Sequence, residues 1–139
     1  MFLIRILYAS EVSSSFQPGD VESILESARH NNSANNITGL LCFNNKYFLQ
    51  CLEGSRSRVN DTYQRILKDP RHQRVIMLDY REIFKREFDQ WSMGYVPQTH
   101  LTRNLNMRYS ATPEFDPFEM SGESVYQLLA SIRDNIPSV

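Results

Sequence analysis

Residues 37–54 read ITGLLCF (37–43), NNK (44–46) and YFLQCLEG (47–54). Two runs that are rich in aromatic and branched residues flank a short polar turn, and this pattern is typical of a β-hairpin. Gln50 is the exception in the second run, because its neighbours are apolar. A primary amide left without partners at a buried position costs about 1–3 kcal/mol. The sequence therefore predicts that other polar side chains meet Gln50.

The chain has 139 residues and a formal net charge of -1. This length suits one domain with a hydrophobic core, and the near-neutral charge gives no electrostatic reason to expect nucleic acid as a partner. No apolar run is long enough to span a membrane, and the first residues do not resemble a signal peptide. Cys42 and Cys51 fall at strand positions, where buried free thiols are more common than a redox pair. We therefore expect a cytoplasmic protein.

Hydrophobic periodicity predicts the other elements. A strand over 2–9 has apolar residues on both faces, so it should be central in a sheet that is covered on both sides. A helix should begin at Asp20, a candidate N-cap, and end near Asn31 and Asn32, with a loop over 32–36. The remaining expected elements are a loop over 10–17, a helix from Ser55 to Asp69-Pro70, strands over 74–81 and 91–96, a mostly irregular stretch over 99–120, and a helix from Ser121 with Val125, Leu128, Leu129 and Ile132 on one side.

The order of these elements indicates the fold class. A strand-helix-strand-strand-helix-strand run is the ferredoxin-like arrangement, which places the first two helices side by side on one face of a sheet. Apolar residues on both strand faces require cover on the other face too, and the last helix can supply it. We therefore expect an α+β fold, ferredoxin-like βαββαββ, with a mixed five-stranded sheet, two helices on one face and a C-terminal helical segment on the other.

Polar side chains from several elements converge on one region of this fold. If Tyr8 and Gln50 share the helix-side face of neighbouring strands, a phenol and an amide meet beneath the two helices. Further polar residues follow near the ends of these helices: Asn31, Asn32, Arg65, Asp69, Arg71 and His72. Each has an ordinary explanation, such as a tyrosine that satisfies a core glutamine, an ion pair between residues 65 and 69, or a helix cap. Together they suit a flat heteroaromatic ligand with an edge of donors and acceptors.

Six short motifs lie in a specific order and spacing: Leu7-Tyr8-Ala9-Ser10, Ala28-Arg29-His30-Asn31-Asn32, Asn36-Ile37-Thr38-Gly39-Leu40-Leu41, Phe48-Leu49-Gln50-Cys51-Leu52-Glu53-Gly54, Asp69-Pro70-Arg71-His72 and Trp91-Ser92-Met93. With them the chain resembles the BLUF family, the sensors of blue light using FAD, over about residues 2–96. The resemblance implies a flavin-binding core over 1–97. Residues 98–139 would then form a loop and helix that pack on the sheet, as in the short, single-domain members.

The resemblance also implies a role for each candidate residue. Tyr8 matches the electron and proton donor to the excited flavin, and Gln50 matches the glutamine between that tyrosine and the flavin. The residues implied in binding FAD are Gln50, Asn31, Asn32, Arg65, Asp69, Arg71 and His72, with Ile24, Ile37, Leu41 and Phe48 as apolar contacts of the ring. Trp91 and Met93 match last-strand residues that carry the signal, and which of them lies next to the flavin stays open.

A non-enzymatic photoreceptor is the function that this resemblance implies. Light would drive electron and proton transfer from Tyr8 and rearrange the hydrogen bonds of Gln50, which shifts the absorption to the red and alters a protein–protein interaction. A homo-oligomer is expected, whereas the response partner stays open. Three other functions are considered: a flavin-dependent oxidoreductase, although no G-x-G-x-x-G motif is present; an RNA-recognition module, which the charge disfavours; and a cofactor-free interaction domain.

Overall fold

A five-stranded sheet lies at the centre of the computed structural model, which describes residues 2–135. Its strands are β1 (Leu3–Val12), β2 (Thr38–Phe43), β3 (Tyr47–Ser55), β4 (His72–Ile83) and β5 (Gly94–Val96), in the order β4-β1-β3-β2-β5. All neighbours are antiparallel except β2 and β5, which run parallel. The expected mixed, five-stranded α+β architecture is therefore confirmed.

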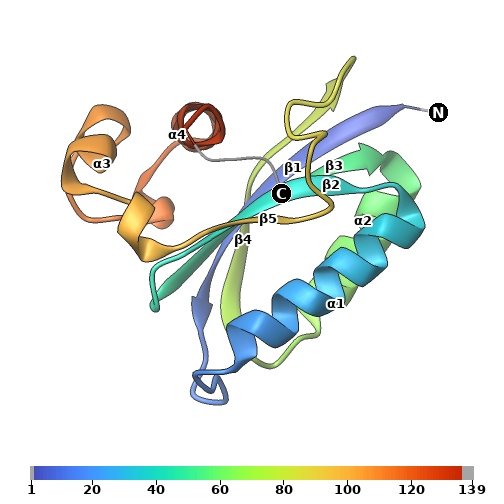
Figure 1. Ribbon diagram of the computed structural model, residues 1–139, viewed down its shortest axis with the longest axis horizontal. Coiled ribbons are helices and arrows are strands. Elements are labelled where there is room, and N and C mark those ends of the chain that lie inside the picture. The colour runs from blue at the N-terminus through green and yellow to red at the C-terminus, as the bar shows by residue number, and fades with distance from the viewer. Residues whose placement is uncertain (1, 136–139) are drawn as a thin grey trace.

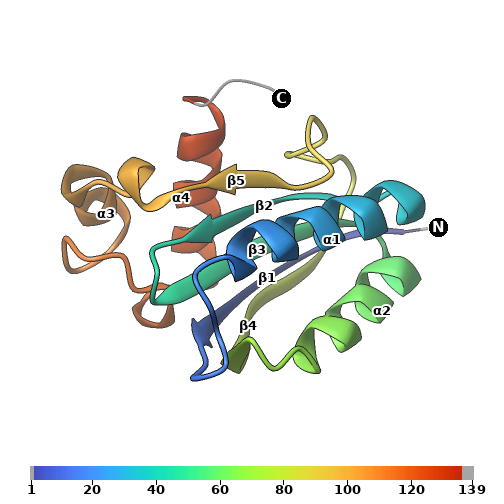
Figure 2. The same ribbon diagram turned by 60° about the horizontal axis from the view of Figure 1, so that its bottom comes forward.

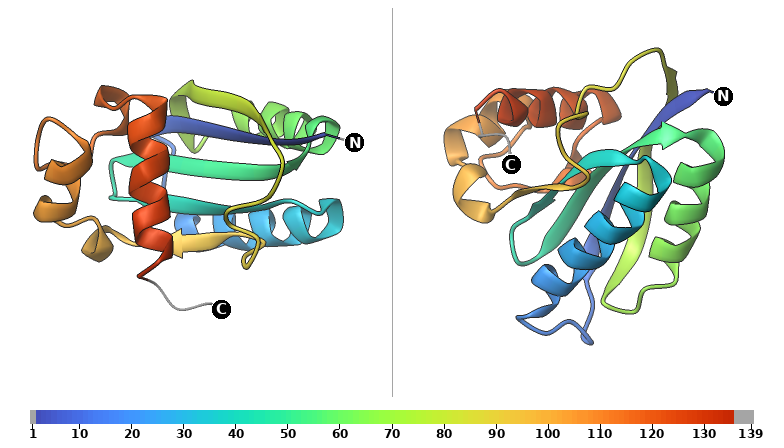
Figure 3. Two further views of the ribbon diagram at one scale, coloured as in Figure 1. Left: turned by 90° about the horizontal axis from the view of Figure 1, so that it is seen from above. Right: turned by 45° about the vertical axis from the view of Figure 1, so that its right-hand side comes forward.

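Helices cover both faces of the sheet (Figure 1). On one face lie α1 (Asp20–Asn35) and α2 (Arg56–Leu67), side by side, while α4 (Gly122–Arg133) crosses the strands on the other (Figures 2 and 3). The connection to α4 contains α3 (Arg103–Tyr109) and the short 3₁₀ turns η1 (Gln98–His100) and η2 (Pro117–Glu119). None of the helices within residues 2–135 is long and apolar enough to cross a membrane.

The sheet separates two hydrophobic cores, as the two-faced pattern of β1 requires. Ile4, Ile6 and Tyr8 lie in the core beneath α1 and α2, whereas Leu7 lies in the core beneath α4. The expected apolar side of the last helix is buried in that second core: Val125, Leu128, Leu129 and Ile132. Both cysteines are free and buried there too, and burial raises their pKa, so they are core thiols as expected.

The first helix differs from its expected bounds at both ends. Gly19 is the N-cap, while Asp20 is the first helical residue and its carboxylate accepts a hydrogen bond from the backbone N–H of Gln17. The helix continues to Asn35, so the loop expected over 32–36 was wrong. Asn36 ends the helix instead, because it adopts the left-handed conformation with a φ of 56°. Because of this extra turn, Asn31 and Asn32 lie within the helix and not at its end.

Strand lengths also depart from the expectation. The first strand extends to Val12 and β4 covers 72–83, whereas the last strand is only Gly94–Val96. The pairing of β1 with β4 is irregular at two places, where β4 carries an extra residue relative to β1. In the C-terminal part, Ser121 caps α4 as expected, since its hydroxyl accepts from the backbone N–H of Ser124.

Gly39 permits the close approach of β2 and β3, and we expect that Gly39→Ala disrupts it. A Cβ at this position would lie 2.0 Å from the carbonyl oxygen of Cys51, which is backbone and cannot move aside. We expect a loss of on the order of 1–3 kcal/mol or more in the free energy of unfolding, measured with urea.

Gly19→Ala is the matched control, because a Cβ at residue 19 would have nothing within 4 Å. Its free energy of unfolding should stay close to that of the wild type. Equal stability of the two variants would contradict the close approach described at Gly39.

Candidate functional site

A cavity of about 510 Å³ lies between α1 and α2, over β1 and β3. The polar and apolar candidates expected at a ligand site line it together: Tyr8, Ile24, Asn31, Asn32, Leu41, Phe48, Gln50, Arg65, Asp69, Arg71 and His72. Ile37 does not line the cavity but lies in the core beneath it. The structure therefore brings residues from four strands, two helices and the loop after α2 to one place.

Tyr8 and Gln50 form the floor of this cavity. They stand directly opposite each other on β1 and β3 and share the face that α1 and α2 cover. The Tyr8 hydroxyl donates a hydrogen bond to Oε1 of Gln50. Burial raises the pKa of Tyr8, with smaller contributions from Tyr63 and Asp69, so the phenol stays neutral and keeps its proton. This pair satisfies the acceptor end of the amide that the sequence left without a partner.

The donor end of the Gln50 amide points to the segment before β5. Its Nε2 lies 3.4 Å from Sδ of Met93, which is a weak acceptor. Trp91, by contrast, is packed in the core on the α4 side of the sheet, and its indole N–H has no partner within residues 2–135. The structure thus places Met93, and not Trp91, beside Gln50.

Asparagines of α1 form the polar wall of the cavity. Asn31 Nδ2 donates to Thr62 Oγ1 of α2 at 3.1 Å, and Arg65 donates to Asn31 Oδ1. Asn32 is buried and its Nδ2 donates to the carbonyl oxygen of Ser92 at 2.7 Å. The interpretation of Asn31 and Asn32 as a helix cap was therefore wrong, because both lie inside α1 and contact neighbouring elements.

Asp69 pairs with Arg71 and not with Arg65. Its carboxylate accepts from the backbone N–H and from the guanidinium of Arg71, with the shortest distance 2.7 Å at Nη2. Desolvation acts to raise the pKa of Asp69, but the hydrogen bonds from Arg71 outweigh it and hold that pKa below its usual range. The ion pair considered between residues 65 and 69 is replaced by this one, and Arg65 instead donates to Asn31 of α1.

His72 is held in a defined orientation at the end of the cavity. Its Nε2 lies 2.8 Å from the carbonyl oxygen of Ile66 and its Nδ1 lies 2.8 Å from the hydroxyl of Ser10. A carbonyl oxygen can only accept, so Nε2 carries a proton and, in a neutral ring, Nδ1 accepts from Ser10. The His72 ring lies nearly perpendicular to the rings of Tyr8 and Phe48, with interplanar angles of 71° and 89°.

Sequence reasoning missed other lining residues. They are Ser27, Ala28, His30, Ala34, Asn35, Leu52, Thr62 and Ile66. A helical spacing would have found most of them: on α1 the positions 27, 28, 31 and 35 follow Ile24 at intervals of three and four, and on α2 the positions 65 and 66 follow Thr62 in the same way. Within residues 2–135 no group of three or more His, Cys, Asp or Glu side chains could hold a metal ion.

This geometry suits a flat ligand bound between α1 and α2. Its faces would contact apolar side chains, one edge would meet the amides of Gln50 and Asn32, and the mouth offers guanidinium and carboxylate groups. The volume lies within the range of small-molecule sites, roughly 300–1,000 Å³.

Comparison with known proteins gives a match to one family. The family model described as "BLUF: Sensors of blue-light using FAD" matches residues 3–94. The "Blue light- and temperature-regulated antirepressor BluF" of Escherichia coli (strain K12) is 32% identical over 76 residues, which are 55% of this chain. The chain spans only 19% of the length of that relative.

Two solved structures resemble almost the whole chain. One is titled "BlrB - a BLUF protein, dark state structure", at a TM-score of 0.79 and 30% identity, covering 94% of this chain and 97% of that one. The other is titled "BlsA photo-activated state", at a TM-score of 0.84 and 28% identity, covering 93% of each chain. The likeness therefore extends past the residues that the family model matches.

Proposed function

The chain belongs to the BLUF family of blue-light sensors that use FAD, and from this membership we propose that its response to light runs through Tyr8 and Gln50. The observation that carries the proposal is the hydrogen bond from the Tyr8 hydroxyl to Oε1 of Gln50 on the floor of the cavity. No covalent attachment is needed, because the cavity has apolar walls and polar groups on two sides.

The residues around the cavity fit the ring system of FAD. Leu41, Phe48 and Ile24 would contact its apolar faces, while the amides of Gln50 and Asn32 would meet the ring edge that carries nitrogen and carbonyl groups. Further polar groups would hold the rest of the ring or the ribityl chain: Asn31, Arg65, Asp69, Arg71 and His72.

Bound FAD supplies blue absorption and, once excited, a strong one-electron oxidant. Tyr8 can give up one electron, and a phenol that does so also releases its proton. Gln50 can receive that proton at Oε1 and pass one on from its other end, because an amide carries both an acceptor and donors. Once Tyr8 is again a neutral phenol, a Gln50 amide that had rotated or changed tautomer would present different hydrogen bonds to the edge of the ring. Those changed hydrogen bonds would shift the absorption to the red.

The output of this chain is proposed to be a change in contacts between proteins, and not a catalysed reaction. Met93 contacts Gln50 directly, so a turned amide alters the segment that leads into β5, with Trp91 on its other side. The name of the E. coli relative, an antirepressor, supports a protein partner of this kind. A homo-oligomer whose contacts depend on light is the second form that such an output would take.

The test is an absorption spectrum of the purified chain, supplied with FAD, before and after blue light. We expect a yellow protein whose absorption moves slightly to the red on illumination and returns in the dark. A protein that stays colourless, or whose spectrum is indifferent to light, would refute the proposal. Turnover of NADH in the dark would favour an oxidoreductase instead.

A further inference from the structure

Glu53 is a buried carboxylate that the cavity does not use. It lies on β3 three residues after Gln50, so the two side chains point to opposite faces of the sheet. Glu53 has no exposed surface, and burying an ionised carboxylate is costly unless hydrogen bonds and a counter-charge compensate it. Desolvation raises its pKa, while the bonds described next act in the opposite direction.

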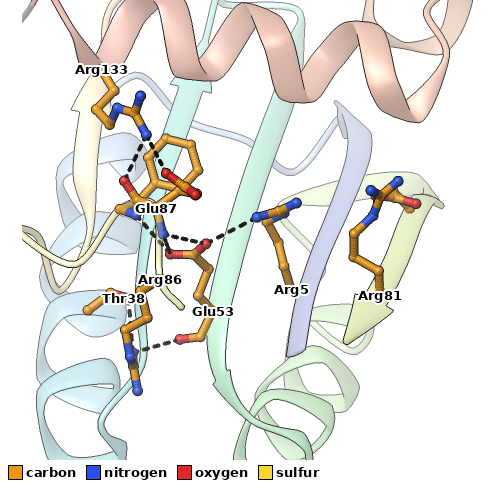
Figure 4. Close-up of polar contacts among 9 residues, drawn as sticks. Arg5, Thr38, Glu53, Arg81, Arg86, Glu87 and Arg133 are labelled. Atoms are coloured by element: carbon orange, nitrogen blue, oxygen red, sulfur yellow. Dashed lines mark hydrogen bonds and ion pairs between the residues drawn. The ribbon is translucent and has the colours of Figure 1, made fainter. Parts of the chain in front are cut away.

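The partners of Glu53 are mainly backbone groups of the segment 84–93, which connects β4 to β5. Its Oε1 accepts from the backbone N–H of Phe88 at 2.9 Å, and its Oε2 accepts from that of Glu87 at 3.0 Å (Figure 4). Arg5 on β1 supplies the counter-charge, with Nη1 at 3.5 Å. Arg86 adds a hydrogen bond from Nη1 to the backbone oxygen of Glu53 at 3.1 Å. Glu53 therefore fixes the first half of this segment to the sheet.

The same segment contacts α4 through Glu87 and Phe88, the residues whose backbone N–H groups donate to Glu53. Arg133, the last residue of α4, donates from Nη1 to the Glu87 carboxylate at 3.0 Å and to its backbone oxygen at 3.2 Å. Phe88 is fully buried in the core that α4 covers. Arg5 itself lies under α4, with its guanidinium 4.2 Å from the ring centre of Tyr126.

The other end of the segment reaches the cavity. Besides its contact with Gln50, Met93 accepts at its backbone oxygen from Arg29 Nε of α1 at 3.0 Å, and the preceding Ser92 accepts from Asn32. Only four residues lie between Phe88 and Met93. If Gln50 turns its amide, Oε1 faces Sδ of Met93, and two acceptors then oppose each other.

We infer that Glu53 is a positioning residue that makes the hold on α4 depend on the hydrogen-bond state of Gln50. In the dark, the segment 84–93 is fixed at Gln50 on one face of the sheet and at Glu53 on the other, and α4 is docked on it. Loss of the Met93 contact in the light shifts the segment, weakens the N–H bonds to Glu53 and loosens α4. The inference rests on the proposed function, since it needs light to act on Gln50.

Hydrogen exchange of the full chain with FAD tests this coupling. In the wild type, amides of residues 122–133 should exchange faster in blue light than in the dark. In Glu53→Gln, which loses the charge and presents an amide to the two backbone donors, dark exchange should rise to the lit level and the light-to-dark ratio should approach unity. FAD binding and the red shift should persist. A purely structural role would raise exchange in both states and leave the ratio unchanged.

Glu82→Gln is the matched control, because Glu82 is an exposed carboxylate on β4, and it should keep the wild-type ratio. If Glu53→Gln does not fold, Glu87→Gln replaces it, since it removes the carboxylate that Arg133 contacts and should also bring the ratio towards unity. A wild-type ratio in the folded variant overturns the inference. So does a wild type that shows the red shift without any change at 122–133, whereas a wild type without a red shift means that the proposed function itself has failed.

Discussion

Replacing Gln50 with leucine should abolish the light-induced red shift while FAD remains bound. The Gln50 amide accepts the hydrogen bond of the Tyr8 hydroxyl and donates to Met93. Leucine therefore removes the only hydrogen-bonding atoms of that side chain. We expect the apolar walls and the polar groups of α1 and α2 to stay in place and to keep the flavin bound. The measurement is the difference spectrum between illuminated and dark protein, with the bound flavin quantified on the same sample.

The stability of the same variant gives an internal check. Leucine at 50 leaves the Tyr8 hydroxyl buried without its acceptor, which costs about 1–3 kcal/mol. Adding Tyr8→Phe removes the orphaned hydroxyl, so the double variant should recover part of the lost free energy of unfolding. A normal red shift in Gln50→Leu would rule out the role given to this residue.

The second large effect is expected for Tyr8→Phe, which should lose the normal photocycle. The phenol is buried, neutral and hydrogen-bonded to Gln50, and phenylalanine keeps the ring but has neither the proton nor a comparable ease of oxidation. The yellow colour should remain, because the hydroxyl is one of many groups around the cavity. Transient absorption after a blue flash measures the loss.

Tyr63→Phe is the control for that experiment. Tyr63 is mostly buried and its ring centre lies 5.7 Å from that of Tyr8, but the Gln50 bond belongs to Tyr8. The photocycle of Tyr63→Phe should follow that of the wild type. An unaltered cycle in Tyr8→Phe would count against Tyr8 as the donor.

The floor of the site could be predicted from the sequence because strand pairing is periodic. Once β1 and β3 are neighbours, side-chain alternation leaves two arrangements, and the register of the pair decides whether Tyr8 and Gln50 share a face. The end of α1 could not be predicted in the same way. Asparagine is common both inside and at the ends of helices, and only the backbone conformation of Asn36 distinguishes the cap from Asn31 and Asn32.

The segment 84–93 shows a different limit. It has no hydrophobic period, so the sequence could not separate Trp91 on one side of the sheet from Met93 on the other. The role of Glu53 could not be predicted either. Its partners include the backbone N–H groups of Glu87 and Phe88, which lie 34 and 35 positions further along the chain. Every residue except proline has a backbone N–H group, so the amino-acid sequence does not show which of them meets a side chain.

The irregular pairing of β4 bears on how copies of this chain can associate. β4 is an outer strand, and a second strand that added to its free side would need an unbroken ladder of N–H and carbonyl groups. The two extra residues on β4, and a φ of 53° at Arg74, interrupt that ladder. Open-ended growth into fibres through this side of the sheet is thereby disfavoured.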